Sequence, residues 1–480
     1  MQTEINVGRL SQGPFQIEQD DGWYTIYLTT PSKKPVRNPG MGLIAYAWEE
    51  NGPSIKARKG EETLEEHVEK LASLPFVDVL YIRCDWRDVQ SSPGRLDLHP
   101  IWEATLDAAK RHGLRVAFRI QLSSPNIQPA RLSMPDFLQG QVPLVNIGRF
   151  NEREFDYFEP RYDHPAFQAA FHELNELLAE RFDGDPLIEF VDLMMYGFWG
   201  EGHTNNLPNP FPDYATAEHT FMAMTRQQIE RWKQTPLAVN TQPDISRTGN
   251  RSVREYAMSE GCWVRTDSIV LDEPEQIEVI SNRAPWTAAV IEDGYYRHFK
   301  LEKLAFDSAN VDVIANSMLH ALDTGGNYWG LWTEAEAIAE YDERYPEGIR
   351  ELQRPLGYRL RPAWIWQRKR MGTDELVFAL ANDGVAGVPG TLWLEAESQN
   401  GDKVRGKLAP GSPVPGKVCM ASMILPQHWR GQTIKLGIRL ETRPGVMKPL
   451  NWACAQQINE DGTLTIPLKA HGDPDWRCGV

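Results

Sequence analysis

The chain has 480 residues, a net charge of −16 at neutral pH and 41 % hydrophobic residues. This length is too great for one ordinary core, and it suits a barrel of about 250–350 residues together with a second module. The acidic balance, with no basic run or stripe, argues against nucleic acid and anionic membranes as partners. No stretch approaches the roughly 18 continuous apolar residues of a membrane-spanning helix.

The cysteines and the first residues of the chain indicate the cellular compartment. The five cysteines form no C-x-x-C pair and have no metal-ligand spacing, so free thiols and no cofactor are expected. The first residues include neither a basic segment nor an apolar one of the kind found in signal peptides. We therefore expect a cytoplasmic protein by default, and a periplasmic or secreted one if a signal peptide was removed.

Short apolar runs alternate with amphipathic helical stretches over residues 37–355, after a polar extension (1–36) that contains one strand-like run at 23–29. Eight such strand–helix units predict a closed (β/α)8 TIM barrel rather than an open sheet. The expected strands are 42–47, 77–84, 115–122, 188–196, 236–240, 262–266, 287–291 and 327–331.

Two further segments depart from this alternation. A polar stretch at 123–163 is too long for a routine connection, and we expect it to fold over the active face of the barrel. From residue 356 to 480, short alternating runs are separated by turn pairs such as Asn400-Gly401 and Asp461-Gly462. This pattern predicts a C-terminal antiparallel β-sandwich.

Residues 187–203 contain the most informative local pattern. An apolar run breaks into glycines around a single carboxylate, Glu201, with Trp199 before it and His203 after it. A buried parallel strand that ends in this way opens its last side chains into a pocket. A carboxylate beside a Trp suits chemistry on a sugar, whereas a solvated turn residue is the alternative interpretation.

The ends of the other expected strands add more polar and aromatic side chains, and a barrel of this kind carries its active site there. Glu201 and Glu292 follow the fourth and seventh strands, nearly opposite each other on the ring. Hydrolysis of a glycosidic bond needs one protonated and one ionised carboxyl group. We expect apolar walls to raise the pKa of one carboxyl and a nearby Arg to hold the other ionised. The expected substrate-binding residues are Arg83, Asp85, Trp86, Arg119, Trp199, His203, Asn240, Asp267, Tyr295, Trp329 and Trp332.

Several motifs resemble those of clan A glycoside hydrolases. Arg83-x-Asp85-Trp86, then 93–97 and 113–116, is similar to the passage between the second and third barrel strands of these enzymes. More closely, the chain resembles bacterial glycosidase-like proteins of unknown function, with Gly-x-Trp-Gly-Glu at 197–201, Gly-Tyr-Arg at 357–359 and a β-sandwich. The resemblance implies a carbohydrate substrate and a retaining mechanism, with Glu201 as the acid/base and Glu292 as the nucleophile.

Two alternative functions stay open. Gly200 occupies the position at which the clan A motif has Asn, which favours a catalytically inactive barrel that binds carbohydrate. The other alternative is metal-assisted hydrolysis of another bond, with Glu201, His203 and Asp267 as ligands. Because these residues lack a recognised ligand spacing, we expect no metal. The β-sandwich is expected to bind glycan, brace the barrel or mediate a homo-oligomer.

Overall fold

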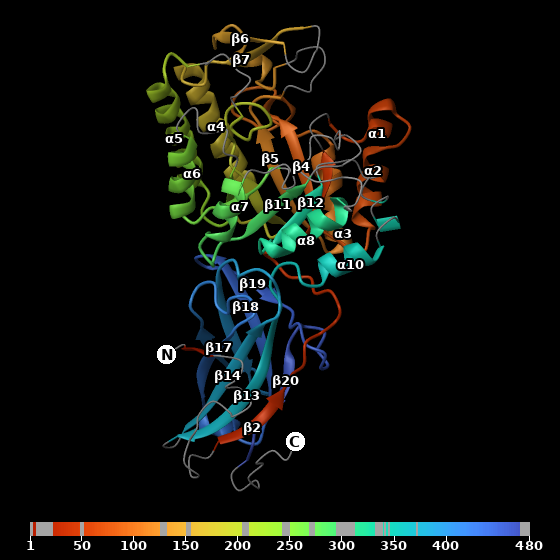
Figure 1. Ribbon diagram of the computed structural model, residues 1–480, viewed down its shortest axis with the longest axis vertical. Helices are drawn as coiled ribbons and strands as arrows, with labels where there is room; N and C mark the ends of the chain where they lie inside the picture. Colours follow the sequence, from red (N-terminus) through yellow and green to blue (C-terminus); the bar gives the residue numbers. More distant parts are fainter. Residues whose placement is uncertain are drawn as a thin grey trace.

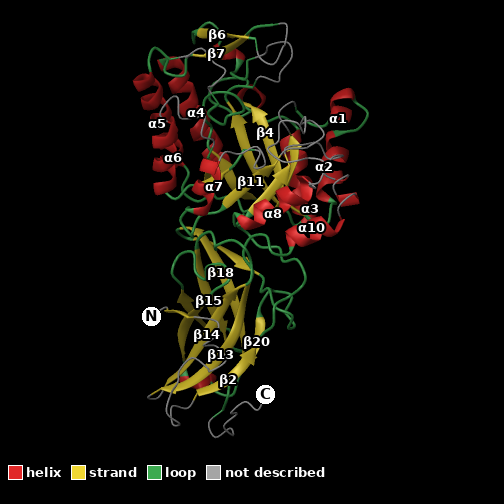
Figure 2. Cartoon of the chain, viewed as in Figure 1, coloured by secondary structure: helices red, strands yellow, loops and turns green. Residues whose placement is uncertain are grey.

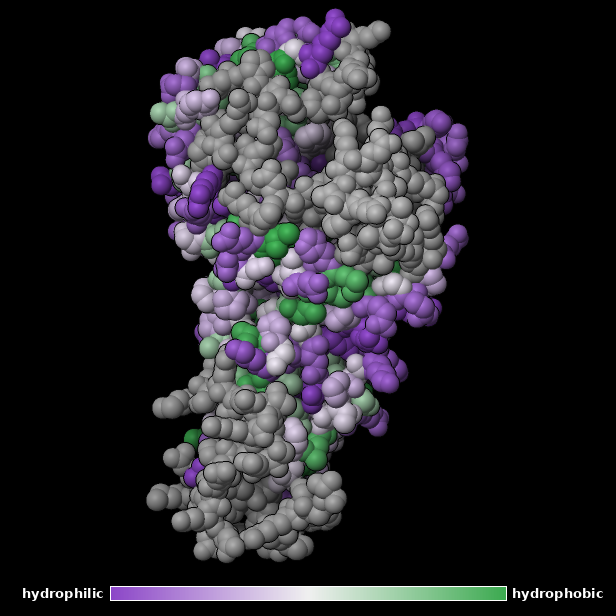
Figure 3. Space-filling view, in the orientation of Figure 1, coloured by the Kyte–Doolittle hydropathy of each residue, from purple (hydrophilic) through white to green (hydrophobic). Residues whose placement is uncertain are grey.

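The chain folds into a barrel surrounded by helices and, at one end of it, a separate body made almost entirely of strands (Figures 1 and 2). No described helix is long and apolar enough to cross a membrane. Among the coloured residues of Figure 3, hydrophobic side chains form small, separate patches. The computed structural model describes residues 3–5, 23–48, 52–124, 132–149, 155–203, 211–241, 250–267, 274–293, 313–331, 339, 342–343, 346–370 and 373–470.

Eight parallel strands close the barrel, with the last strand paired to the first. This confirms the expected (β/α)8 fold followed by an antiparallel β-sandwich. The strands, in their order around the ring, are β3 (Gly42–Trp48), β4 (Val77–Asp85), β5 (Arg115–Gln121), β8 (Ile188–Asp192), β9 (Leu237–Asn240), β10 (Trp263–Arg265), β11 (Ala289–Asp293) and β12 (Tyr328–Leu331).

Helices cover the outside of this ring, and their apolar faces pack against the outward-facing strand residues. A separate cluster, which includes Tyr46, Phe190 and Tyr328, fills the interior of the barrel. The helices are α1 (Ile55–Lys59), α2 (Leu64–Ala72), α3 (Ile101–His112), α4 (Pro165–Phe182), α5 (Tyr214–Arg231), α6 (Asn250–Ser259), α7 (Pro274–Ser281), α8 (Val313–Asp323) and α10 (Pro346–Gln353).

The fourth barrel strand is shorter than its apolar run. The sequence predicts a strand over 188–196, but β8 ends at Asp192. Residues 193–196 remain buried in the core between the strands and the helices. The Gln228 side chain hydrogen-bonds both backbone groups of Met194. It accepts from Met194 N at 2.8 Å and donates to Met194 O at 3.1 Å. The apolar run therefore reports burial rather than strand pairing.

The segment after β5 contains an antiparallel hairpin of β6 (Leu144–Gly148) and β7 (Tyr157–Pro160). Figure 1 shows this hairpin beyond the carboxyl ends of β4 and β5, at the end of the barrel away from the sandwich. The hairpin in this polar stretch thus lies at the end of the barrel where the active site is expected.

The sandwich consists of two antiparallel sheets that enclose their own hydrophobic core. Its first sheet includes two N-terminal strands, β1 (Thr3–Ile5) and β2 (Trp23–Leu28). Both pair with strands more than 300 residues away in sequence. The boundaries at residues 36 and 355 stay a prediction. One sheet has the order β1 (Thr3–Ile5), β17 (Val418–Leu425), β14 (Thr373–Asn382), β13 (Leu360–Arg370) and β2 (Trp23–Leu28). The other contains β16 (Lys403–Lys407), β15 (Thr391–Glu397), β18 (Thr433–Arg443), β19 (Val446–Leu450) and β20 (Leu464–Pro467).

A buried carboxylate, Glu189 of β8, connects the barrel to the sandwich. It accepts hydrogen bonds from Arg115 Nη1 at 2.6 Å, from the Tyr328 hydroxyl at 2.6 Å and from Gly40 N at 2.5 Å. Lys448 of β19 lies 3.2 Å from its other oxygen. Burial alone would raise the pKa of Glu189, but these partners outweigh it and lower the pKa to about 2.

Replacing Glu189 with Gln is expected to lower the free energy of unfolding by about 3 kcal/mol at pH 7. The native pKa lies below that of an unfolded Glu, so the stabilisation is complete above about pH 4.5 and is lost as the pH falls toward 2. Urea unfolding of both proteins at pH 7 and pH 3 measures this change. Glu347→Gln, at an exposed position of α10, is the control; an equal loss in both variants, or one independent of pH, would contradict the assignment.

Candidate active site

Glu201 lies in a tight turn that follows β8. Phe198 and His203 close the turn as an isolated antiparallel bridge, with Phe198 N donating to His203 O at 3.3 Å. Trp199 has φ +59°, the only positive φ of a non-glycine residue in the described parts of the chain. Gly197 also has a positive φ, and a Cβ there would lie 2.2 Å from His203 O. The glycines of this motif thus allow a closed turn that presents Glu201 and His203 together.

Arginines surround the Glu201 carboxylate, which is 2 % exposed. Arg119 Nη1 donates to Oε1, and Arg83 Nη1 lies 3.7 Å from the same oxygen. Burial would raise the pKa of Glu201, but Arg119, Arg83 and the contact with His203 outweigh it and hold the pKa well below the usual range. The expectation that apolar walls raise a carboxyl pKa is therefore wrong for Glu201, because charged partners occupy those walls.

Glu292 of β11 is equally buried and has a different set of partners. The Tyr46 hydroxyl donates to Oε2 at 2.7 Å, and the Arg265 guanidinium pairs with the same oxygen. Burial raises the pKa of Tyr46 to about 12 despite the nearby arginines, so the phenol keeps its proton at neutral pH. These partners fix the orientation of the Glu292 carboxyl group.

Arg83 brings the two glutamates together. Its Nη1 atom is 3.7 Å from Glu201 Oε1 and 3.7 Å from Glu292 Oε1. The two carboxylate oxygens therefore lie within twice that distance of each other. Two residues that are 91 positions apart in sequence converge at the carboxyl ends of the strands, as the sequence predicts.

Asp192 is a third buried carboxylate that the sequence analysis missed. Arg119 Nη2 lies 3.0 Å and Arg265 Nη1 3.3 Å from its Oδ2 atom, and the Tyr81 hydroxyl donates to the same atom. The available signal was a charged residue in an otherwise apolar buried strand, Ile188–Asp192. Asp192 pairs with two of the three site arginines, Arg119 and Arg265, and helps to hold them in place.

Other predicted residues also lie at this end of the barrel. Asp85 Oδ1 accepts from Gln121 Nε2 at 3.2 Å, and Asn240 is buried at the end of β9. Trp199 contacts the ring of His203 edge-on, with centroids 5.1 Å apart. Tyr295 and Trp332 lie outside the described residues.

Two predicted sugar platforms instead belong to the layer between the strands and the helices. Trp86 is fully buried, packs against Phe167 with centroids 5.5 Å apart and donates its indole N–H to Gln90. Trp329 is buried in the same outer core and alternates along β12 with Tyr328, which faces the interior. Neither ring is placed to stack on a substrate.

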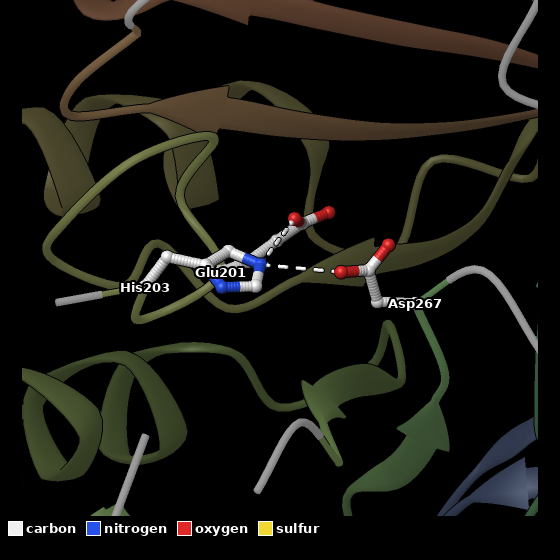
Figure 4. Close-up of side chains that lie close together, drawn as sticks. All are labelled: Glu201, His203 and Asp267. Carbon is white, nitrogen blue, oxygen red and sulfur yellow. Dashed lines mark hydrogen bonds and ion pairs between the residues drawn. The ribbon is translucent and has the colours of Figure 1, made fainter. Parts of the chain in front are cut away.

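The more exposed side of the site contains His203 and Asp267. Figure 4 shows the His203 ring between the carboxylates of Glu201 and Asp267. His203 Nε2 is 3.2 Å from Glu201 Oε2 and 3.2 Å from Asp267 Oδ2. The side chain of His203 is 13 % exposed and that of Asp267 is 19 % exposed, whereas that of Glu201 is 2 % exposed. The site therefore opens to solvent on this side.

Comparison with known proteins gives distant structural matches. No protein-family model and no curated protein matches the chain. Similar solved structures include the catalytic domain of β-amylase from Paenibacillus polymyxa, with 10 % identity, a TM-score of 0.42 and coverage of 65 % of this chain and 97 % of that one. An endogalactoceramidase matches at 14 % identity and a TM-score of 0.38 over 84 % and 98 % of the two chains. A β-galactosidase from Marinomonas ef1 matches at 12 % identity and a TM-score of 0.39, with coverage of 65 % of this chain and 62 % of that one.

Proposed function

We propose that the protein hydrolyses glycosidic bonds of a carbohydrate, with Glu201 and Glu292 as the two reacting carboxyl groups. The observation that carries this proposal is their convergence on a single nitrogen, Arg83 Nη1, at 3.7 Å each. Retaining enzymes place their carboxyl groups about 5–5.5 Å apart and inverting ones about 6.5–9.5 Å apart. The shared contact allows the retaining separation and also the lower part of the inverting range. We propose retention, as the resemblance to clan A glycoside hydrolases implies.

In this scheme Glu292 is the nucleophile. Its Oε2 atom pairs with Arg265 and accepts a hydrogen bond from the Tyr46 hydroxyl, and both contacts favour the carboxylate form. An oriented carboxylate attacks the anomeric carbon as the leaving group departs and forms a glycosyl ester. Water then releases the sugar.

Glu201 is the proposed acid/base. Its contacts with Arg119, Arg83 and His203 favour the carboxylate, the form that acts as a base in the second step. The first step instead needs a protonated Glu201 whenever the leaving group is a poor one. The low pKa of Glu201 therefore makes proton donation the more demanding part of the cycle.

This proposal predicts a pH dependence that differs between substrates. For an unactivated glycoside, kcat/KM is expected to rise as the pH falls, since the protonated fraction of Glu201 increases toward its low pKa. A glycoside with a dinitrophenyl leaving group needs no proton and should not show this rise. Paired pH profiles of kcat/KM test the difference. Identical profiles for the two substrates would contradict proton donation by Glu201.

A specific observation favours one second candidate, metal-assisted hydrolysis of another bond. His203 and Asp267 flank the same carboxylate that would otherwise act as a free acid. A panel of esters and amides, assayed with and without added divalent metal, separates this candidate from a glycosidase.

The direct test of the proposed function is a product screen over aryl glycosides and a glycan library. We expect the wild-type protein to release reducing sugar from at least one member, and Glu292→Gln to release none from that member. Tight binding of a glycan with no product over days would instead support an inactive carbohydrate-binding barrel. Failure to cleave or bind any member would overturn the proposal.

A further inference from the structure

The most unusual cluster in the site is the set of three donor atoms Glu201 Oε2, His203 Nε2 and Asp267 Oδ2. These atoms all lie within 4.8 Å of one another. Glu201 and His203 come from the turn after β8, and Asp267 is the second residue after β10. We propose that they bind a divalent transition metal ion, such as zinc or manganese. This proposal does not depend on the glycosidase proposal.

The two distances from His203 fit a shared cation, and the two carboxylate oxygens lie within 4.8 Å of each other. Ligand atoms at about 2.0–2.2 Å from a zinc ion lie roughly 3.2–3.6 Å apart in tetrahedral geometry. His203 Nε2 lies 3.2 Å from each carboxylate oxygen. An imidazole Nε2 carries at most one proton, so it cannot donate a separate hydrogen bond to both oxygens. A cation between the three atoms interacts with all of them at once.

Neighbouring contacts support the orientation of these ligands. Arg119 Nη1 donates to Glu201 Oε1, which leaves Oε2 directed at His203. Trp199 packs against the His203 ring at 89°. Metal ligands are commonly fixed by such outer contacts, which set the ring orientation and the free lone pair. The left-handed backbone of Trp199 places these two rings in contact, and such strain is retained where a site requires it.

The described side chains of the site include more acidic groups than basic ones. Five described carboxylates and three described guanidinium groups lie at this end of the barrel. Carboxylates close to a bound cation attract it electrostatically. The carboxylates belong to Asp85, Asp192, Glu201, Asp267 and Glu292, and the guanidinium groups to Arg83, Arg119 and Arg265.

The donor set indicates the class of ion. One imidazole nitrogen with two carboxylate oxygens suits zinc and manganese better than calcium, which takes six to eight oxygen ligands. Three protein ligands leave a coordination position for water or substrate, as in catalytic rather than structural zinc sites. His203 and Asp267 are partly exposed, so that position is reachable from solvent.

The test is metal binding to the full chain after chelation and buffer exchange. Titration with zinc or manganese chloride, followed by elemental analysis, is expected to give about one ion per chain. His203→Ala and Asp267→Asn should each weaken binding by about 100-fold or more. His219→Ala, at an exposed position of α5, is the matched control and should bind as the wild type does. Circular dichroism verifies that the variants fold.

Two results would overturn the metal site: no binding of either ion at millimolar concentration, or binding that both ligand variants retain. A rise in melting temperature with metal in the wild type but not in Asp267→Asn would support it independently of activity. Glycosidase activity is read separately. Cleavage that survives complete chelation leaves the proposed function intact, and metal binding without any cleavage removes the function but not the site.

Discussion

Replacing Glu292 with Gln is expected to lower kcat/KM by about 1,000-fold or more, because the amide cannot form the glycosyl ester. Asp293→Asn is the matched control. Successive residues of a strand point to opposite faces, and Glu292 shares the inward register of Val290 in β11. The control should therefore lose less than about tenfold. Initial rates on the substrate found by the library screen measure both.

The opposite result would assign the nucleophile to a different residue. If Asp293→Asn abolished turnover while Glu292→Gln kept it, the nucleophile would be Asp293 and the register argument would be wrong. If both variants kept wild-type turnover, neither carboxylate of β11 would take part. Glu201→Gln adds a further check, since an acid/base variant should keep most of its activity on a dinitrophenyl glycoside.

Replacing Arg119 with Met is expected to lower the free energy of unfolding by about 3–5 kcal/mol. Arg119 pairs with both Asp192 and Glu201, and its removal leaves two buried carboxylates with fewer partners. The pKa of Glu201 should rise, since Arg119 is the strongest of the groups that lower it. Urea unfolding measures the loss, and pH profiles of kcat/KM for an unactivated glycoside should show the acid-side rise moved to higher pH.

Two comparisons make this test specific. The double variant Arg119→Met/Asp192→Asn should recover part of the loss, because one of the unpaired charges is gone. Arg111→Met removes an exposed guanidinium paired with Glu69 and should cost less than about 1 kcal/mol. A loss in Arg119→Met no larger than in Arg111→Met would contradict the role of Arg119 in holding the buried carboxylates.

The sequence was sufficient to predict the barrel, because each of its strands and helices has a local pattern of its own. It also placed Glu201 and Glu292 at the same end of the barrel, since all parallel strands of a closed ring end on one side. The predicted fourth strand is too long because residues 193–196 are as apolar as a strand. In the structure the backbone of Met194 bonds the Gln228 side chain instead of a neighbouring strand.

Long-range contacts could not be predicted in the same way. Asp192, Tyr46 and Tyr81 contact the arginines only because distant strands bring them together across the barrel. Local patterns likewise did not show that β2 pairs with β13, more than 300 residues away. The side of the strand on which Trp329 lies depends on register, which a run of apolar residues on both faces does not reveal.

The most direct test of the carboxylate pair is covalent trapping with 2-deoxy-2-fluoro glycosides of the sugars that the protein cleaves, followed by mass spectrometry of its peptides. We predict one adduct per chain, on the peptide that contains Glu292, and no adduct in Glu292→Gln. An adduct elsewhere, or none with any sugar that the protein hydrolyses, would contradict a retaining glycosidase built on Glu201 and Glu292.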